Sequence, residues 1–227
     1  MSEYERVLGA LGAAADDEFK AFSSKIVNAG KPLIGVRTPI IKKIVKAVND
    51  EEAREYLSEC KFEFFEDTLV YGLLIARLPF YEFKRYLPVY LSNVDSWAHI
   101  DGFVASIKCV KDGYDEFLAF IKEGFFEAEG FSLRFRIVAL MDYYLENEIN
   151  FILNSLEKID KKGYYNDMAI AWLLSIAFVK RKNATERYLK NDNLSTFTHN
   201  AAIRKVCDSF RVAVQDKEEM KKYLRKK

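Results

Sequence analysis

Apolar residues recur every three or four positions along almost the whole chain, which is the spacing that places them on one face of an α-helix. The segment after Thr38-Pro39 is typical, with apolar pairs at 40–41 and 44–45 followed by Val48. Thr38 is expected to cap this helix, and Pro39 to occupy its first position, where a proline costs no hydrogen bond. The pattern therefore predicts a chain built mainly from amphipathic helices.

The same pattern predicts roughly a dozen helices in total. Besides the helix at Thr38, they are expected at residues 4–12, 16–28, 51–59, 63–77, 80–91, 114–125, 149–159, 164–180, 184–190, 195–212 and 217–224, with one more from Trp97 and a long one through Arg134 and Tyr144. Pro88 is expected to interrupt or kink the helix at 80–91. No stretch alternates like a strand, and no linker rich in Gly, Ser or Pro divides the chain. We therefore predict an all-α fold, with one domain over residues 1–227 built as an α-solenoid of antiparallel helix pairs.

Composition supports this fold and excludes several classes of site. Half of the 227 residues are hydrophobic, 30% are charged, and there are only 10 Gly and 4 Pro. Cys60, Cys109 and Cys207 are far apart and only two histidines are present, so neither a disulfide framework nor a metal site is expected. There is no Gly-rich phosphate loop and no Ser elbow, and hence no support for nucleotide hydrolysis or acyl transfer. We expect a protein that needs no cofactor.

The ends and the longest uncharged segment indicate where the protein works. The N-terminus lacks the basic and then apolar pattern of a secretion signal. The longest uncharged run, 168–179, is shorter than the roughly 20 residues that span a bilayer. No heptad pattern or symmetric interface is visible in the sequence. We therefore expect a cytoplasmic monomer that does not associate with a membrane.

Charge is distributed unevenly although the net charge is only +1. Residues 1–179 carry 21 Lys and Arg and 28 Asp and Glu, whereas residues 180–227 carry 14 and 6. Such a basic segment indicates a polyanionic partner, although a solvated, Lys-rich helical tail is equally consistent with it. Arg204, Lys205 and Arg211 are the candidate phosphate contacts within this segment.

A second candidate phosphate contact lies at the start of the helix at Thr38. Arg37 precedes this helix, and backbone N–H groups at a helix N-terminus can hold a phosphate. The alternative is that this turn is only a well-capped helix start.

The segment from Ser96 to Phe103 carries the strongest chemical pattern. Trp97 and Asp101 are four residues apart and would share one face of a helix that Asp95 or Ser96 could cap. Taken alone, this stretch is also consistent with a core tryptophan and an ordinary exposed acid.

Two further residues recur at a similar interval after Trp97. Arg134 lies 37 residues after Trp97, and Trp172 lies 38 residues after Arg134. Tandem two-helix repeats have periods of roughly 34 to 47 residues, and their equivalent positions line up on one surface. The spacing therefore predicts that these residues, together with Asp101, converge on one concave and partly basic groove.

These elements, in this order, resemble the AlkD-like DNA alkylation repair proteins, which are DNA glycosylases built from HEAT-like repeats. The resemblance runs over nearly the whole chain. It rests on the turn at 35–39, the Trp-x-x-x-Asp element at 96–101, the Arg-bearing helix at 133–144 and the Ala-Ile-x-Trp helix at 168–172. The resemblance implies a substrate of double-stranded DNA that carries alkylated bases.

The resemblance also implies roles for individual residues. Asp101 matches the catalytic carboxylate, and Trp97 and Trp172 match the aromatic walls of the site. Arg134 matches the arginine that contacts the DNA backbone, with Arg136 as the other possible equivalent.

One departure from the family pattern concerns the first repeat. Family members can place a Tyr before the first-repeat Gly to cradle the lesion, whereas this chain has Phe19, Phe22 and Ile26 there. No hydroxyl is available at these positions, so this chain lacks that contact.

The implied reaction is hydrolysis of the N-glycosidic bond of purines alkylated at N3 or N7. Alkylation makes the base cationic, so that it leaves as a neutral molecule, and positive charge then builds on the deoxyribose as in sugar hydrolysis. Asp101 would stabilise that charge. The alternative hypothesis is a HEAT-like repeat scaffold that binds nucleic acid or protein without chemistry, because a fold does not by itself imply a function.

Overall fold

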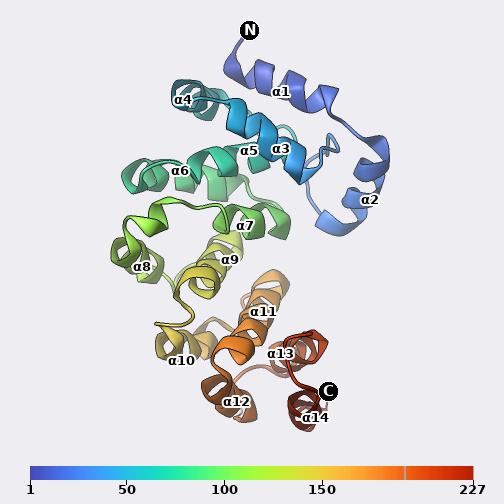
Figure 1. Ribbon diagram of the computed structural model, residues 1–227, viewed down its shortest axis with the longest axis vertical. Coiled ribbons are helices and arrows are strands. Elements are labelled where there is room, and N and C mark those ends of the chain that lie inside the picture. The colour runs from blue at the N-terminus through green and yellow to red at the C-terminus, as the bar shows by residue number, and fades with distance from the viewer. Residues whose placement is uncertain (192, 227) are drawn as a thin grey trace. The chain divides into compact units, whose positions relative to one another are not determined.

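The computed structural model describes residues 1–191 and 193–226, and this part of the chain contains α-helices and no strand. Figure 1 shows the helices following one another in chain order. The predicted all-α fold class is confirmed, and fourteen α-helices within the described residues are compatible with a helical repeat solenoid. The chain divides into two compact units, Met1–Phe117 and Leu118–Lys227, which are described separately. None of the described helices has the length and apolarity needed to cross a membrane.

The first unit is a stack of helices in which α3, α5 and α7 contact one another in turn (Figure 1). Its helices are α1 (Glu3–Ala13), α2 (Asp17–Val27), α3 (Thr38–Ala47), α4 (Asp50–Glu59), α5 (Phe65–Ile75), α6 (Phe80–Asn93) and α7 (Trp97–Val104). Helices α4 and α6 pack against α5, and α1 packs against α3 and α4. Helix α2 buries only Val27 and lies beside this stack in Figure 1. The core is therefore formed by the apolar faces of helices that come in pairs, as the periodicity predicts.

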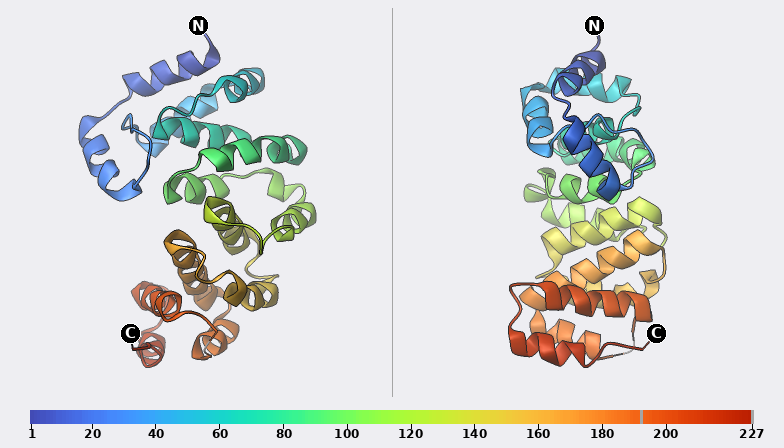
Figure 2. Two further views of the ribbon diagram at one scale, coloured as in Figure 1. Left: turned by 180° about the vertical axis from the view of Figure 1, so that it is seen from behind. Right: turned by 90° about the vertical axis from the view of Figure 1, so that its right-hand side faces the viewer.

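The second unit repeats this plan. Helix α8 (Tyr114–Lys122) leads into it, followed by α9 (Gly130–Ala139), α10 (Ile149–Ile159), α11 (Tyr164–Lys180), α12 (Lys182–Lys190), α13 (Thr196–Asp208) and α14 (Val214–Lys221). Helix α11 contacts both α9 and α13, while α12 packs against α10 and α11. Helices α13 and α14 run side by side at the C-terminal end (Figure 2). Successive pairs thus share one layer formed by α9, α11 and α13.

Several predicted helix boundaries differ from those of the structure, and the helix over 80–91 is not interrupted at Pro88. Arg37, not Thr38, is the N-cap of α3, and no side chain caps this helix. Helix α6 continues through Pro88, because this proline is solvent-exposed and water can hydrate the carbonyl group that loses its N–H partner. The long helix through Tyr144 leaves the α-helical geometry after Ala139 and continues as a π-helical segment, Leu140–Tyr144. Helix α14 begins three residues before the predicted start at 217.

Candidate functional site

Helix α7 presents Trp97 and Asp101 on one face of the first unit. Both side chains are half-buried, whereas His99, Ile100 and Phe103 point into the core. A spacing of four residues within α7 puts the indole and the carboxylate on the same face of the helix. Burial of the remaining face fixes the direction in which this pair points.

The start of α7 is bound to the loop that follows α2. Ser96 caps the helix, because its Oγ accepts the Ala98 N–H at 3.4 Å, and its hydroxyl also donates to the Val27 carbonyl. Asp95 does not cap α7, because its Oδ2 accepts the N–H groups of Gly30 and Lys31 at 3.0 and 2.9 Å. The sequence did not distinguish Asp95 from Ser96 as the residue that caps α7. In the structure Ser96 caps the helix, and Asp95 binds backbone N–H groups of the loop after α2. These bonds hold Trp97 at a defined position.

His99 lies beneath this surface and connects α7 to α5. Its side chain is fully buried, its Nε2 lies 3.0 Å from the Phe65 carbonyl oxygen, and its ring centroid lies 4.2 Å from that of Phe65. Its Nδ1 lies 3.3 Å from Asp95 Oδ1, and neither atom has hydrogen-bond geometry to any other described group. Burial lowers the pKa of His99 to about 4, and the Asp95 carboxylate opposes this shift. His99 is thus a core residue that supports α7, and it lies away from the face of Asp101.

This pKa shift predicts that the protein loses stability as the pH falls. The folded-state pKa of about 4 lies below the ordinary value of 6.5, so the unfolded chain binds the proton more readily between these values. The free energy of unfolding should therefore fall by about 2 kcal/mol between pH 7.5 and pH 5 from this group alone. Urea titrations at the two pH values measure it. In His99→Gln, whose amide can still donate to Phe65, this part of the pH dependence should disappear, and its persistence would contradict the assignment.

A small recess lies among α3, α5 and α7, and none of the predicted site residues lines it. It has a volume of about 100 Å³, and its lining includes Lys42 from α3, Leu69 and Leu73 from α5, and Ala98 and Gly102 from α7. Small-molecule pockets usually measure about 300–1,000 Å³. The recess is therefore too small to enclose a purine base.

The turn before α3 is organised around a buried carboxylate that the sequence did not single out. Glu66 of α5 is 2% exposed and accepts the N–H groups of Ile34, Gly35 and Val36 at 2.8, 2.8 and 3.1 Å. The backbone amides of this turn are thus already bonded. No local sequence pattern indicates this contact, because Glu66 and the turn are about thirty residues apart in the chain.

Arg37 remains the candidate phosphate contact at this turn. Its guanidinium binds Asp16 through Nε and Nη2 at 3.2 and 3.0 Å and lies 4.7 Å above the Phe19 ring. The side chain is still 54% exposed, so a phosphate could reach it in competition with Asp16. On the neighbouring α2, Phe22 and Ile26 are solvent-exposed.

The predicted residues of the α7, α9 and α11 helices do not occupy equivalent positions of the repeat. Helices α7, α9, α11 and α13 begin at Trp97, Gly130, Tyr164 and Thr196, so these repeats are 32 to 34 residues long rather than 37 or 38. Trp97 is the first residue of its helix, Arg134 the fifth and Trp172 the ninth. The intervals of 37 and 38 residues that separate Trp97, Arg134 and Trp172 therefore each correspond to one repeat plus about one helical turn.

Counting by the true repeat gives two other matches. Asp101 and Arg134 are both fifth residues, of α7 and α9, while Trp172 and Arg204 are both ninth residues, of α11 and α13. Because α11 packs against α13, Trp172 and Arg204 belong to neighbouring helices of the second unit. Trp172 is half-buried and Arg204 is exposed.

Arg134 and Arg136 both bind main-chain carbonyls within the second unit. Arg134 is 5% exposed, and its Nη1 donates to the Tyr165 carbonyl at 2.6 Å. Nη1 of Arg136 donates to the carbonyls of Phe120 and Ile121 at 2.8 and 2.7 Å, close to the end of α8. Burial lowers the pKa of Arg136. Both arginines therefore have structural bonds, and their role toward DNA stays a prediction.

Part of the positive charge of the basic C-terminal segment is engaged in ion pairs. Lys182 binds Asp216 at 2.6 Å, Lys190 binds Glu186 at 2.8 Å, and Lys222 binds Glu219 at 2.8 Å. By contrast, the predicted cations Arg204, Lys205 and Arg211 form no ion pair with another described residue. Their charge is therefore available to an anionic partner.

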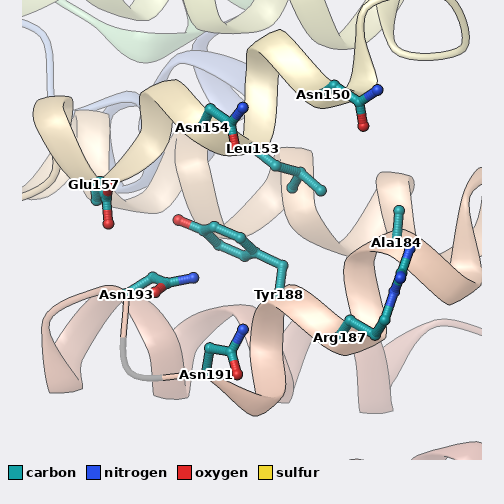
Figure 3. Close-up of a pocket in the computed structure, with 9 residues that line it drawn as sticks. All are labelled: Asn150, Leu153, Asn154, Glu157, Ala184, Arg187, Tyr188, Asn191 and Asn193. Atoms are coloured by element: carbon teal, nitrogen blue, oxygen red, sulfur yellow. The ribbon is translucent and has the colours of Figure 1, made fainter.

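A polar groove of about 460 Å³ lies between α10 and α12 of the second unit, and none of the predicted site residues lines it. Figure 3 shows Tyr188 of α12 with its hydroxyl directed toward the α10 side of the groove. This hydroxyl has no hydrogen-bond partner among the described residues, and burial raises the pKa of Tyr188. Elsewhere, no group of three His, Cys, Asp or Glu side chains in residues 1–191 and 193–226 is arranged to hold a metal ion.

Comparison with known proteins completes the description. A search of curated proteins gives no match. The family profile described as "DNA alkylation repair enzyme" matches residues 7–206, a range that includes Trp97, Asp101 and Trp172. The match covers most of both units, and the chain belongs to the family of DNA alkylation repair enzymes.

Proposed function

We propose that the protein is a monofunctional DNA glycosylase that hydrolyses the N-glycosidic bond of purines alkylated at N3 or N7 in duplex DNA. Membership of a DNA alkylation repair family supports repair of alkylated DNA as its task. The observation that carries the finer proposal is the pairing of Trp97 and Asp101 on one anchored face of α7. A carboxylate beside an indole suits a positively charged group better than a neutral one.

The reaction breaks the bond between C1′ of the deoxyribose and the base nitrogen, and the bonding electrons neutralise the cationic base. Water then forms a bond to C1′ and loses a proton, leaving an abasic site. No general acid is needed, because the cationic base becomes a neutral molecule as it leaves. The barrier lies in the positive charge that builds on the sugar, which resembles the oxocarbenium ion of glycoside hydrolysis. Asp101 stabilises this charge and orients the water, while Trp97 presents its π face to the cation.

This mechanism predicts which lesions are removed. Enzymes that extrude a base read it with polar groups in a fitted pocket, and the recess lined by Ala98 and Gly102 of α7 is too small to hold a purine. Selection should therefore depend on the charge of the lesion and its weakened bond. 7-Methylguanine, 3-methyladenine and bulkier cationic adducts should be released, whereas uracil and hypoxanthine should stay.

We also propose that Arg204, Lys205 and Arg211 in the second unit, and Arg37 in the first, bind DNA phosphates. Alanine at Arg204 or Lys205 should weaken duplex binding and reduce the slope of log K against log salt by about 0.9 per lost contact. Binding measured over a salt series tests this. Lys182→Ala, which removes a cation already paired with Asp216, is the matched control and should leave the slope unchanged. An unchanged slope for both Arg204→Ala and Lys205→Ala would place the DNA elsewhere.

The experiment that tests the proposed reaction is a glycosylase assay on duplex DNA that contains 7-methylguanine, with abasic sites revealed by alkaline cleavage. Excision supports the proposal. Duplex binding without excision is the result expected of a repeat scaffold, and it would refute the glycosylase.

A further inference from the structure

Four aromatic rings form a continuous ladder on the second unit. Phe131 contacts Tyr165 with ring centroids 5.7 Å apart, Tyr165 contacts Tyr164 at 5.5 Å, and Tyr164 contacts Phe197 at 6.0 Å. We call these four residues the aromatic ladder. Tyr164 is 62% exposed and Phe197 is 49% exposed, so the ladder is not part of the core.

The aromatic ladder follows the repeat. Phe131 and Phe197 are the second residues of α9 and α13, and Tyr164 and Tyr165 are the first two residues of α11. Trp97 is the first residue of α7, so each of these four helices carries an aromatic side chain at its first or second position. The proposed site and the aromatic ladder thus use corresponding positions of the repeat.

The exposed ends of the aromatic ladder share helix faces with other proposed contacts. On α11, Tyr164 and Trp172 are eight residues apart and therefore lie on one face. On α13, Phe197 shares a face with Arg204 and Lys205, seven and eight residues later, and neither cation has an ion pair among the described residues. Aromatic rings beside available cations are the combination that binds nucleic-acid strands, with the cations on phosphates and the rings on apolar surface.

We propose that the aromatic ladder binds one strand of DNA through the apolar faces of its deoxyriboses or bases. This inference rests on the proposed function for the identity of the partner and adds a contact surface to it. Exposed apolar rings cost free energy in water, so an edge of this kind is stabilised when a partner covers it. The cations on α13 supply the charge complementarity that a DNA strand requires and that an uncharged partner would not.

Binding of a fluorescent, undamaged 20-base-pair duplex by Tyr164→Ala and Phe197→Ala tests this proposal. Each variant should bind at least about fivefold more weakly than the wild type, because stacking on one ring contributes roughly 1–3 kcal/mol. The salt slope should stay at the wild-type value, since no phosphate contact is lost, in contrast to Lys205→Ala. Tyr81→Ala is the matched control, because Tyr81 is a 71% exposed tyrosine of the first unit outside the aromatic ladder, and it should bind like the wild type.

A second arm uses the same duplex with a three-nucleotide gap in one strand. A larger loss on the gapped DNA assigns the rings to unpaired bases, and an equal loss assigns them to deoxyriboses. Wild-type affinity of both variants for both DNAs would overturn the proposal. Because the DNA is undamaged, this result does not depend on excision. The proposed glycosylase activity and the proposed role of the aromatic ladder are therefore tested independently of each other. Circular dichroism of each variant confirms that the helices are retained.

Discussion

Replacing Asp101 by Asn is expected to slow the excision of 7-methylguanine by about a hundredfold or more, the usual effect of losing an electrostatic stabiliser of the transition state. The amide keeps the shape of the side chain but removes the negative charge opposite the developing cation. DNA affinity should change little, because the substrate sugar carries no full positive charge in the ground state. Single-turnover kinetics with enzyme in excess separate the two quantities.

The control for this variant is Asp115→Asn, which removes an exposed acid from the first turn of α8. It should react at the wild-type rate, so that a general loss of negative charge is excluded as the cause. An Asp101→Asn protein that reacts within threefold of the wild type would remove Asp101 from the mechanism.

Replacing Glu66 by Ala is expected to destabilise the protein by about 3–5 kcal/mol, because three backbone N–H groups lose a buried, charged acceptor. Gly35 adds to this sensitivity. Its φ of 99° and the 2.7 Å that would separate an added Cβ from the Lys20 Cβ show that the turn requires glycine here and packs closely against α2. Urea unfolding measures the loss. Hydrogen exchange at Ile34, Gly35 and Val36 should accelerate in parallel.

Glu66→Gln provides the graded comparison. The amide keeps one acceptor oxygen but turns an NH2 group toward an N–H donor, so about half of the loss is expected. Equal stability of Glu66→Ala and the wild type would show that the turn is held by other contacts.

Local sequence patterns were enough to predict the helical elements. The 3.6-residue periodicity and a Ser directly before Trp97 depend only on neighbouring residues, and α7 begins where they indicate. The relation of Trp97 to Asp101 was predictable for the same reason, since it is fixed within one helix.

Contacts between distant segments could not be predicted in this way. Glu66 binds a turn about thirty residues earlier in the chain, and nothing in its own neighbourhood indicates that. The family resemblance gave Arg134 the role of a DNA-backbone contact, and no local pattern indicated that its guanidinium lies against the Tyr165 carbonyl, a partner set by the packing of α9 on α11. The repeat length was overestimated because the three residues used to find it advance by one helical turn per repeat.

The most direct test of the proposed glycosylase mechanism is the release of bases from a panel of duplexes that each carry one lesion. Alkaline cleavage at the abasic product measures this release. The proposed mechanism predicts release of 7-methylguanine, 3-methyladenine and a bulky cationic N7 adduct, and no release of uracil or hypoxanthine. It also predicts loss of activity in Asp101→Asn. Efficient release of uracil or hypoxanthine, or rejection of every bulky cationic adduct, would show that a fitted base pocket exists and would contradict the roles given to Trp97 and Asp101.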